Sequence, residues 1–83
     1  MKISIRYFAS VREALSKSNE SIETRAETLA ALRDELIARG VPYAEALARG
    51  KAVRMALDQV MSAESARLVE GAEVAFFPPV TGG

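Results

Sequence analysis

The sequence predicts an α+β fold in which one main helix crosses a mixed β-sheet. Strand-like and helical segments alternate along the 83 residues, a length that allows one small core. The clearest helical spacing, Leu29–Ile37, lies near the middle of the chain, and strand-like segments stand at both ends. This order allows the first and last strands to lie side by side as a parallel central pair joined by a crossover.

The N-terminal third contains two predicted strands and a short helix. Lys2–Phe8, "KISIRYF", alternates strictly, which is typical of a half-buried strand. Ser10 stands three residues before Glu13, the spacing of a capping box, and predicts a short helix through "SVREALSK". The polar segment "NESIETRAE" is then interpreted as a second, hairpin-like strand near a sheet edge.

The main helix has recognisable signals at both ends. Thr28 is the predicted N-cap, the leucines of Leu29–Ile37 recur at helical spacing, and Gly40 stands where a C-terminal glycine cap belongs. Pro42 then allows a second, weaker helix, "YAEALARG", closed by Gly50.

The C-terminal part returns to strand patterns. "AVRMALDQVM" predicts a strand with a turn near Asp58 and Gln59, and a loop with a turn at Gly71 follows. The last strand is predicted over Ala72–Phe77. We expect residues 1–79 to form the domain and residues 80–83 to form a flexible C-terminal tail.

Composition excludes several classes of function. The 11 basic and 11 acidic residues give zero net charge, and no basic stripe is present that would bind nucleic acid. The chain has no cysteine and no histidine, which argues against a thiol nucleophile, a metal site or a general base of near-neutral pKa. No segment reads as a signal peptide or a membrane span, so a cytoplasmic location is expected.

Two aromatic residues predict a protein-binding face. If the helix covers the strand faces that carry Ile5 and Val74, then Phe8 and Phe77 point away from it. One exposed phenylalanine is ordinary, but two on neighbouring strands favour an interface. The residues expected to continue this apolar patch are Pro78, Pro79 and either Val60 or Met61. Charged residues could also orient a partner, although each is more typical of solvated surface; the candidates are Arg12, Glu13, Lys51, Arg54 and Arg67.

The chain closes on "VTGG" after two prolines. Pro78 and Pro79 cannot donate ladder hydrogen bonds, so the sheet must end there and the tail is directed outward. Fully extended, four residues reach about 13 to 14 Å, enough to enter a narrow channel in another protein. The reactive group at the end of this tail is the α-carboxylate of Gly83. A carboxylate is a poor electrophile, and the chain has no G-x-x-x-x-G-K phosphate loop, so a partner must activate it with ATP.

The opening "ISIRYFASVRE" and the ending "LVEGAEVAFFPPVTGG" resemble the small subunits of molybdopterin synthase, the ubiquitin-like sulfur carriers of molybdenum cofactor biosynthesis. The resemblance spans essentially the whole chain and is most specific in the last 16 residues. It implies a ubiquitin-like β-grasp fold with an extended Gly-Gly tail. One departure is "ALDQV", where Asp58 stands in a turn at which relatives usually carry asparagine.

The resemblance also implies a mechanism. An activating enzyme would adenylate Gly83, and sulfur from a persulfide donor would convert it to a thiocarboxylate. The tail, with Val80, Thr81 and Gly82, would then insert into the large synthase subunit, where sulfur is transferred to cyclic pyranopterin monophosphate. Phe8, Phe77, the two prolines and Arg12 would form the docking face. The implied complex is a heterotetramer of two small and two large subunits, with the catalytic side chains on the large subunit.

Two other readings stay open from the sequence. One is a ubiquitin-like sulfur carrier for thiamin, for tRNA thiolation or for cysteine synthesis, which shares the Gly-Gly ending but matches "FFPPVTGG" less well. The other is a β-grasp interaction module with no covalent role. A free-standing enzyme is disfavoured because no acid, base and nucleophile converge in the sequence.

Overall fold

The computed structural model describes residues 1–79, and within them the predicted α+β order is present. The strands are β1 (Lys2–Tyr7), β2 (Asn19–Glu23), β3 (Arg54–Leu57), β4 (Val60–Met61) and β5 (Glu73–Phe77). The helices are α1 (Ala9–Leu15), α2 (Leu29–Ile37) and α3 (Tyr43–Ala46).

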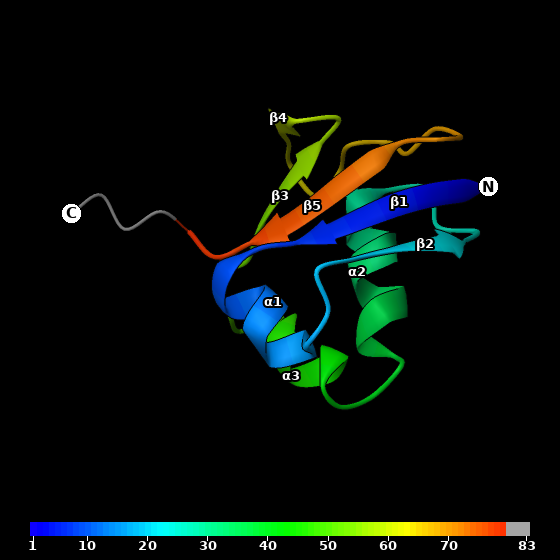
Figure 1. The fold of residues 1–83 in the computed structure, drawn as a ribbon. Coiled ribbons are helices and arrows are strands. Elements are labelled where there is room, and N and C mark those ends of the chain that lie inside the picture. The colour runs from blue at the N-terminus through cyan, green and yellow to red at the C-terminus, as the bar shows by residue number, and fades with distance from the viewer. Residues whose placement is uncertain (80–83) are drawn as a thin grey trace.

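The five strands form one mixed sheet in the order β2-β1-β5-β3-β4 (Figure 1). β1 and β5 are parallel, with Tyr7 opposite Phe76, and every other pair of neighbours is antiparallel. The predicted parallel central pair and the predicted edge position of the second strand are both confirmed. This topology brings residues near both ends of the described chain to the middle of the sheet.

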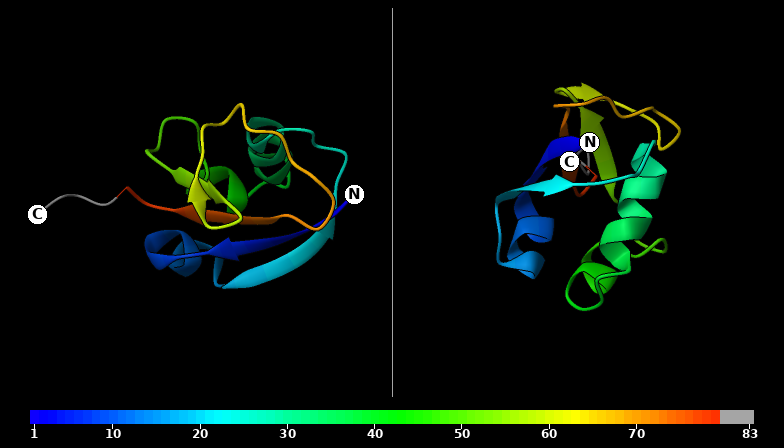
Figure 2. Two further views of the ribbon diagram at one scale, coloured as in Figure 1. Left: turned by 90° about the horizontal axis from the view of Figure 1, so that it is seen from above. Right: turned by 90° about the vertical axis from the view of Figure 1, so that its right-hand side faces the viewer.

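One face of the sheet is covered and the other is open. The covered face carries alternate residues of the central strands, and the three helices lie on that side (Figure 2). Ile5 and Val74 are fully buried there, as the alternation in both strands predicts. The largest buried side chains of the core are Tyr7, Phe76, Ile3, Ile5, Leu29, Leu32, Leu36, Leu47 and Val74.

The first helix begins earlier than the sequence predicts, so the capping-box interpretation of Ser10 is wrong. Phe8 is the N-cap, its carbonyl accepts from the N–H groups of Val11 and Arg12, and no side chain caps the helix. The reason is tertiary: the N–H of Phe8 donates to the carbonyl of Phe76 at 3.1 Å, which keeps Phe8 extended beside β5. Ser10 therefore lies inside the first turn.

The main helix agrees with its local signals. The Thr28 hydroxyl accepts from the N–H of Ala31 at 3.1 Å, so the predicted N-cap is confirmed. Gly40 has a φ of 86° and its N–H donates to the carbonyl of Ile37, which is the left-handed termination expected of glycine. The weaker helix is shorter than predicted and ends at Ala46, well before Gly50.

The turn between β3 and β4 lies where the sequence places it. Asp58 and Gln59 both have positive φ, 49° and 69°, which is the signature of a type I′ hairpin. The turn sets the register so that Ala56 pairs with Met61 and Leu57 pairs with Val60. None of the helices within residues 1–79 has the length and apolarity that a membrane crossing requires.

Glu20 of β2 contacts β1, α3 and the segments that follow α1 and α2, at the end of the core away from β3 and β4. Its carboxylate accepts from the hydroxyls of Tyr7 and Tyr43, at 2.7 and 3.0 Å, and from Arg39 at 3.0 Å, with Lys17 at 3.7 Å. Burial alone would raise the pKa of Glu20, but the hydrogen bonds from Tyr7, Arg39 and Tyr43 outweigh it and lower that pKa. Burial and the bond to Glu20 raise the pKa of Tyr7.

This carboxylate makes stability depend on pH. Because the folded-state pKa of Glu20 is lowered, its contribution is present above the unfolded value of about 4.3 and is lost as pH falls through the lower folded value. We expect Glu20→Gln to lose about 1 to 2 kcal/mol of unfolding free energy at pH 7 and to approach the parent at pH 3. Urea titrations at both pH values measure this. Glu23→Gln, an exposed change in the same strand, is the control; equal losses for Glu20→Gln at both pH values would contradict the expectation.

Candidate docking surface

The open face of the sheet divides into a polar part and an apolar part. The polar part carries Ser4, Arg6 and Glu73, with an ion pair of 4.0 Å between the last two. The apolar part lies toward the end of β5 and crosses to β4. We call it the open-face patch, and its residues are Phe8, Ala56, Met61, Ala75 and Phe77.

Phe8 continues the line of β1 although it is the N-cap of α1. Its φ and ψ, −126° and 153°, are those of a strand, so its side chain projects to the side opposite Tyr7. The side chain is 40% exposed. The Arg6 guanidinium lies 5.8 Å from the centre of its ring, which orients the ring and holds a positive charge beside the open-face patch.

Phe77 is the last residue of β5 and lies on the open face. It pairs with Arg54 of β3, whereas Phe76, the residue before it, is fully buried under the helices. Phe77 itself is half-buried. The predicted orientation of Phe8 and Phe77 away from the helix-covered face is therefore consistent with the strand register.

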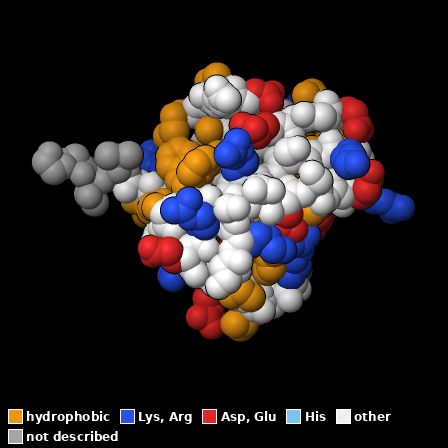
Figure 3. All heavy atoms as spheres, in the orientation of Figure 1, with side chains coloured by type: hydrophobic (Ala, Val, Ile, Leu, Met, Phe, Trp, Pro, Cys, Tyr) orange, Lys and Arg blue, Asp and Glu red, His pale blue; other side chains and the backbone are white. Residues whose placement is uncertain are grey.

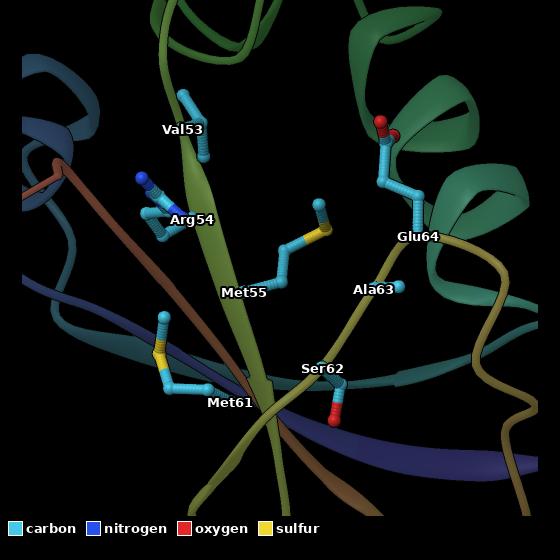
Figure 4. Close-up of a pocket in the computed structure, with 7 residues that line it drawn as sticks. All are labelled: Val53, Arg54, Met55, Met61, Ser62, Ala63 and Glu64. Carbon is cyan, nitrogen blue, oxygen red and sulfur yellow. The ribbon is translucent and has the colours of Figure 1, made fainter.

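The register decides which of Val60 and Met61 belongs to the open-face patch. Met61 pairs with Ala56 and so shares its face, while Val60 pairs with Leu57, which packs against the core. Figure 4 shows Met61 beside Arg54 on one side of β3 and Met55 on the other. Met61 is 58% exposed on the open face, and Val60 is 65% exposed at the sheet edge, turned toward the helix side.

Pro78 and Pro79 lie at the border of the open-face patch. Both are half-buried, and they line a groove together with Val11 and Ala14 of α1 and Val53, which precedes β3. The groove opens on the helix side of the sheet, so apolar surface continues around the end of β5.

Positive charges surround this end of the molecule. Arg12 and Arg54 are exposed and form no ion pair within residues 1–79. Lys51 lines the groove and likewise forms no ion pair within those residues. Figure 3 shows hydrophobic side chains gathered at the end of the molecule where β5 ends, with Lys and Arg side chains beside them. An apolar centre with a polar rim is the general anatomy of a protein interface.

The structure brings most of the predicted interface residues together. Phe8, Phe77 and Met61 share one face, the two prolines border it, and Arg12 lies on α1 one turn after Phe8. The predicted tail residues Val80, Thr81, Gly82 and Gly83 lie outside the described residues. Arg6, Ala56 and Ala75 were not singled out from the sequence, although Arg6 alternates with Phe8 and that spacing could have identified it. Among residues 1–79, no cluster of acidic side chains is arranged to hold a metal ion.

The fold and this surface define a class of protein. A mixed sheet with parallel first and last strands, crossed by one main helix, is the ubiquitin-like β-grasp arrangement. Small archaeal modifier protein 1 of Haloferax volcanii shares this fold with a TM-score of 0.75 at 18% identity, over 95% of this chain and 98% of its own. A chain in a complex of subunits 1 and 2 of the molybdopterin-converting factor of Helicobacter pylori has a TM-score of 0.67 at 24% identity, over the whole of both chains.

Sequence comparison assigns the family. The model of the ThiS family matches residues 5–83, so the chain belongs to the ThiS family. Two curated relatives are each named molybdopterin synthase sulfur carrier subunit. The relative from Escherichia coli is 38% identical and that from Haemophilus influenzae is 35% identical, both over 81 residues, which is 98% of this chain and 99% of each relative.

Proposed function

We propose that this chain is a sulfur carrier subunit of molybdopterin synthase. The observation that carries the proposal is the position of the open-face patch: it lies at the end of β5, immediately before the segment "PPVTGG". A docking surface placed there directs the C-terminal segment into whatever protein binds it. The names and near-complete coverage of the two curated relatives support the same function.

The reaction takes place at the α-carboxylate of Gly83. A carboxylate oxygen attacks the α-phosphorus of ATP held by an activating enzyme, pyrophosphate leaves, and an acyl-adenylate forms. The terminal sulfur of a donor persulfide then attacks the acyl carbon and AMP leaves. A thiol on the partner then attacks the donor's sulfur and forms a disulfide with it, and the sulfur–sulfur bond breaks to leave the thiocarboxylate on Gly83. The chain itself binds no cofactor in this scheme, and the proposed location of the reaction is the cytoplasm.

Two partners use the same surface in this proposal. The activating enzyme binds the open-face patch during adenylation, and the large subunit of molybdopterin synthase binds it during sulfur transfer. Val80, Thr81 and Gly82 are the tail residues that insert into the large subunit, so that Gly83 reaches cyclic pyranopterin monophosphate. The proposed assembly contains two small and two large subunits. The catalytic side chains belong to the large subunit, in keeping with a small subunit that contains no histidine or cysteine.

Charge and shape restrict what can bind here. Arg12 and Arg54 lie at the rim without ion-pair partners in residues 1–79, so the complementary surface carries carboxylates around an apolar centre. Nucleic acid and membrane are not proposed partners, because the net charge is zero and none of the helices within residues 1–79 is long and apolar enough to cross a membrane.

Replacing Phe8 tests the docking surface. We expect Phe8→Ser to weaken binding to the large synthase subunit by about 2 kcal/mol, roughly 30-fold, because the substitution removes an aromatic side chain that the partner would bury in the complex. Serine is a favoured N-cap, so the substitution gives α1 the cap that it lacks and keeps unfolding free energy within about 1 kcal/mol of the parent. Isothermal titration calorimetry of the two purified subunits measures the affinity.

Val69→Ser is the matched control for Phe8→Ser. Val69 is 59% exposed and lies outside the open-face patch, so its replacement removes exposed apolar area without touching the proposed interface. Parent-like affinity of Phe8→Ser, or an equal loss for Val69→Ser, would show that the large subunit binds elsewhere.

A further inference from the structure

The three methionines of the chain differ sharply in exposure. Met55 is 4% exposed, Met1 is 36% exposed and Met61 is 58% exposed. Because the chain contains no cysteine, these thioethers are its only readily oxidised sulfur atoms. Accessibility to solvent therefore predicts that Met61 reacts first with a soluble oxidant and that Met55 reacts last.

Met61 is also the methionine that lies within the open-face patch. It belongs to the edge strand β4, pairs with Ala56, and stands on the face that carries Ala75 and Phe77. Met55 pairs with Phe76 on the covered face, so the two sulfur-bearing side chains lie on opposite sides of β3 (Figure 4). Met1 precedes the opposite end of β1, away from Phe8, and its amino group lies 3.8 Å from Glu23.

We propose that Met61 is an oxidation site whose sulfoxide weakens docking of the chain to its protein partners; the inference rests on the proposed function. The sulfur lone pair attacks one oxygen of a peroxide, the oxygen–oxygen bond breaks and a sulfur–oxygen bond forms. The thioether loses two electrons and hydrogen peroxide is reduced to water. No side chain is needed as base or metal ligand, which fits a surface that has neither.

The effect on docking follows from the surroundings of Met61. A thioether is flexible and apolar and adapts to an apolar partner surface, whereas a sulfoxide is polar and a strong hydrogen-bond acceptor. Its cross-strand partner Ala56, and Ala75 beyond it, have no side-chain donor, and the guanidinium of Arg54 on the same face binds the carboxylates of the partner in the proposed complex. Docking therefore removes water from the sulfoxide oxygen without replacing the hydrogen bond. We expect the affinity for the large subunit to fall roughly tenfold.

Oxidation of Met61 therefore weakens docking, and docking in turn protects Met61 from oxidation. A partner that covers the open-face patch also covers Met61, so the free carrier is oxidised and the bound carrier is protected. Because methionine sulfoxide is reducible by dedicated reductases, the change is reversible. Under peroxide exposure the oxidised carrier therefore binds both partners more weakly.

The test treats the full chain with hydrogen peroxide, maps the added oxygen by peptide mass spectrometry, and measures affinity for the large subunit before and after treatment. We expect Met61 to gain oxygen well before Met55 and to be protected when the large subunit is present. Oxidation of Met61 should lower the affinity for the large subunit roughly tenfold. Methionine sulfoxide reductases should restore the original affinity.

Two variants separate Met61 from the other methionines. In Met61→Leu the ratio of affinities before and after peroxide should be one, whatever the starting affinity, even though Met1 is still oxidised. In Met55→Leu, a volume-conserving core change, the loss on oxidation should persist. If Met55 reacts as fast as Met61, or if oxidised Met61 leaves affinity unchanged, the inference is overturned while the proposed function stands. If the untreated chain does not bind the large subunit, the proposed function fails and the inference falls with it.

Discussion

Removal of Gly83 is expected to abolish conversion of the chain to a thiocarboxylate while leaving its affinity for the large synthase subunit within a few-fold of the parent. The truncated chain still ends in a carboxylate, on Gly82, but that group falls about 3.3 to 3.6 Å short of the original position. Acyl transfer requires the reacting atoms to approach to about 3 to 3.5 Å, so a displacement of one residue removes the productive geometry.

Intact mass spectrometry measures this result directly. The full chain, incubated with the activating enzyme, ATP and a persulfide donor, should exchange one oxygen for one sulfur, and omission of ATP should prevent the exchange. Gly83→Ala is the matched variant, because it keeps the carboxylate at full reach and adds one methyl group beside it. We expect Gly83→Ala to react slowly and the deletion not to react.

The same experiment separates a carrier from an interaction module. A carrier loses all sulfur transfer with Gly83 and keeps its docking surface, because Phe8, Met61 and Phe77 are unchanged. If the full chain never exchanges oxygen for sulfur yet still binds the large subunit, the thiocarboxylate mechanism is wrong and the interaction-module reading replaces it. Conversion of the deletion at the parent rate would place the reactive group elsewhere.

Replacement of Arg33 is expected to give the largest loss of stability. Arg33 is 3% exposed in α2, and its guanidinium donates to the carbonyl oxygens of Leu47, Ala48 and Lys51 at 2.8, 2.7 and 3.2 Å. Burial lowers the pKa of Arg33, and the carboxylate of Glu64, 3.8 Å away, acts in the opposite direction. One side chain thus ties the main helix to the segment that leads into β3.

We expect Arg33→Met to lose about 3 kcal/mol of unfolding free energy, because the substitution leaves buried carbonyl groups without donors. For a domain of this size the midpoint of thermal unfolding should fall by roughly 12 to 24 °C. Arg33→Lys should recover less than half of the loss, since an ammonium group cannot reproduce the planar fork. Urea titration and calorimetry measure both variants.

Arg25→Met is the control for the loss of one positive charge, because Arg25 is exposed and forms no ion pair within residues 1–79. Its unfolding free energy should stay within about 0.5 kcal/mol of the parent. Arg33 also supports the docking surface. The segment that it holds leads to Val53, which lines the groove together with Pro78 and Pro79, and then to Arg54, which pairs with Phe77. A loss of less than about 1 kcal/mol for Arg33→Met would mean that water satisfies those carbonyls.

The sequence predicted most elements because their signals are local. Thr28 caps α2, Gly40 ends it with positive φ, and Asp58 and Gln59 form the hairpin turn, each through bonds or torsions within a few residues. The capping box at Ser10 failed because the competing interaction, from Phe8 to Phe76, spans 68 residues and leaves no local pattern. A buried Arg33 was equally invisible, because an arginine on a helix ordinarily faces solvent.

The sequence by itself determined the alternation of the central strands, the apolar stripe of the main helix, the hairpin turn and the chemical character of the C-terminal segment. These depend on residue spacing and backbone torsions, which any short window of the chain contains. Only the tertiary structure decided that Met61 and not Val60 joins Phe8 and Phe77, because cross-strand register assigns faces and a shift of one residue would exchange them. It also decided where the first helix begins and which arginine is buried, since both follow from contacts between residues far apart in the chain.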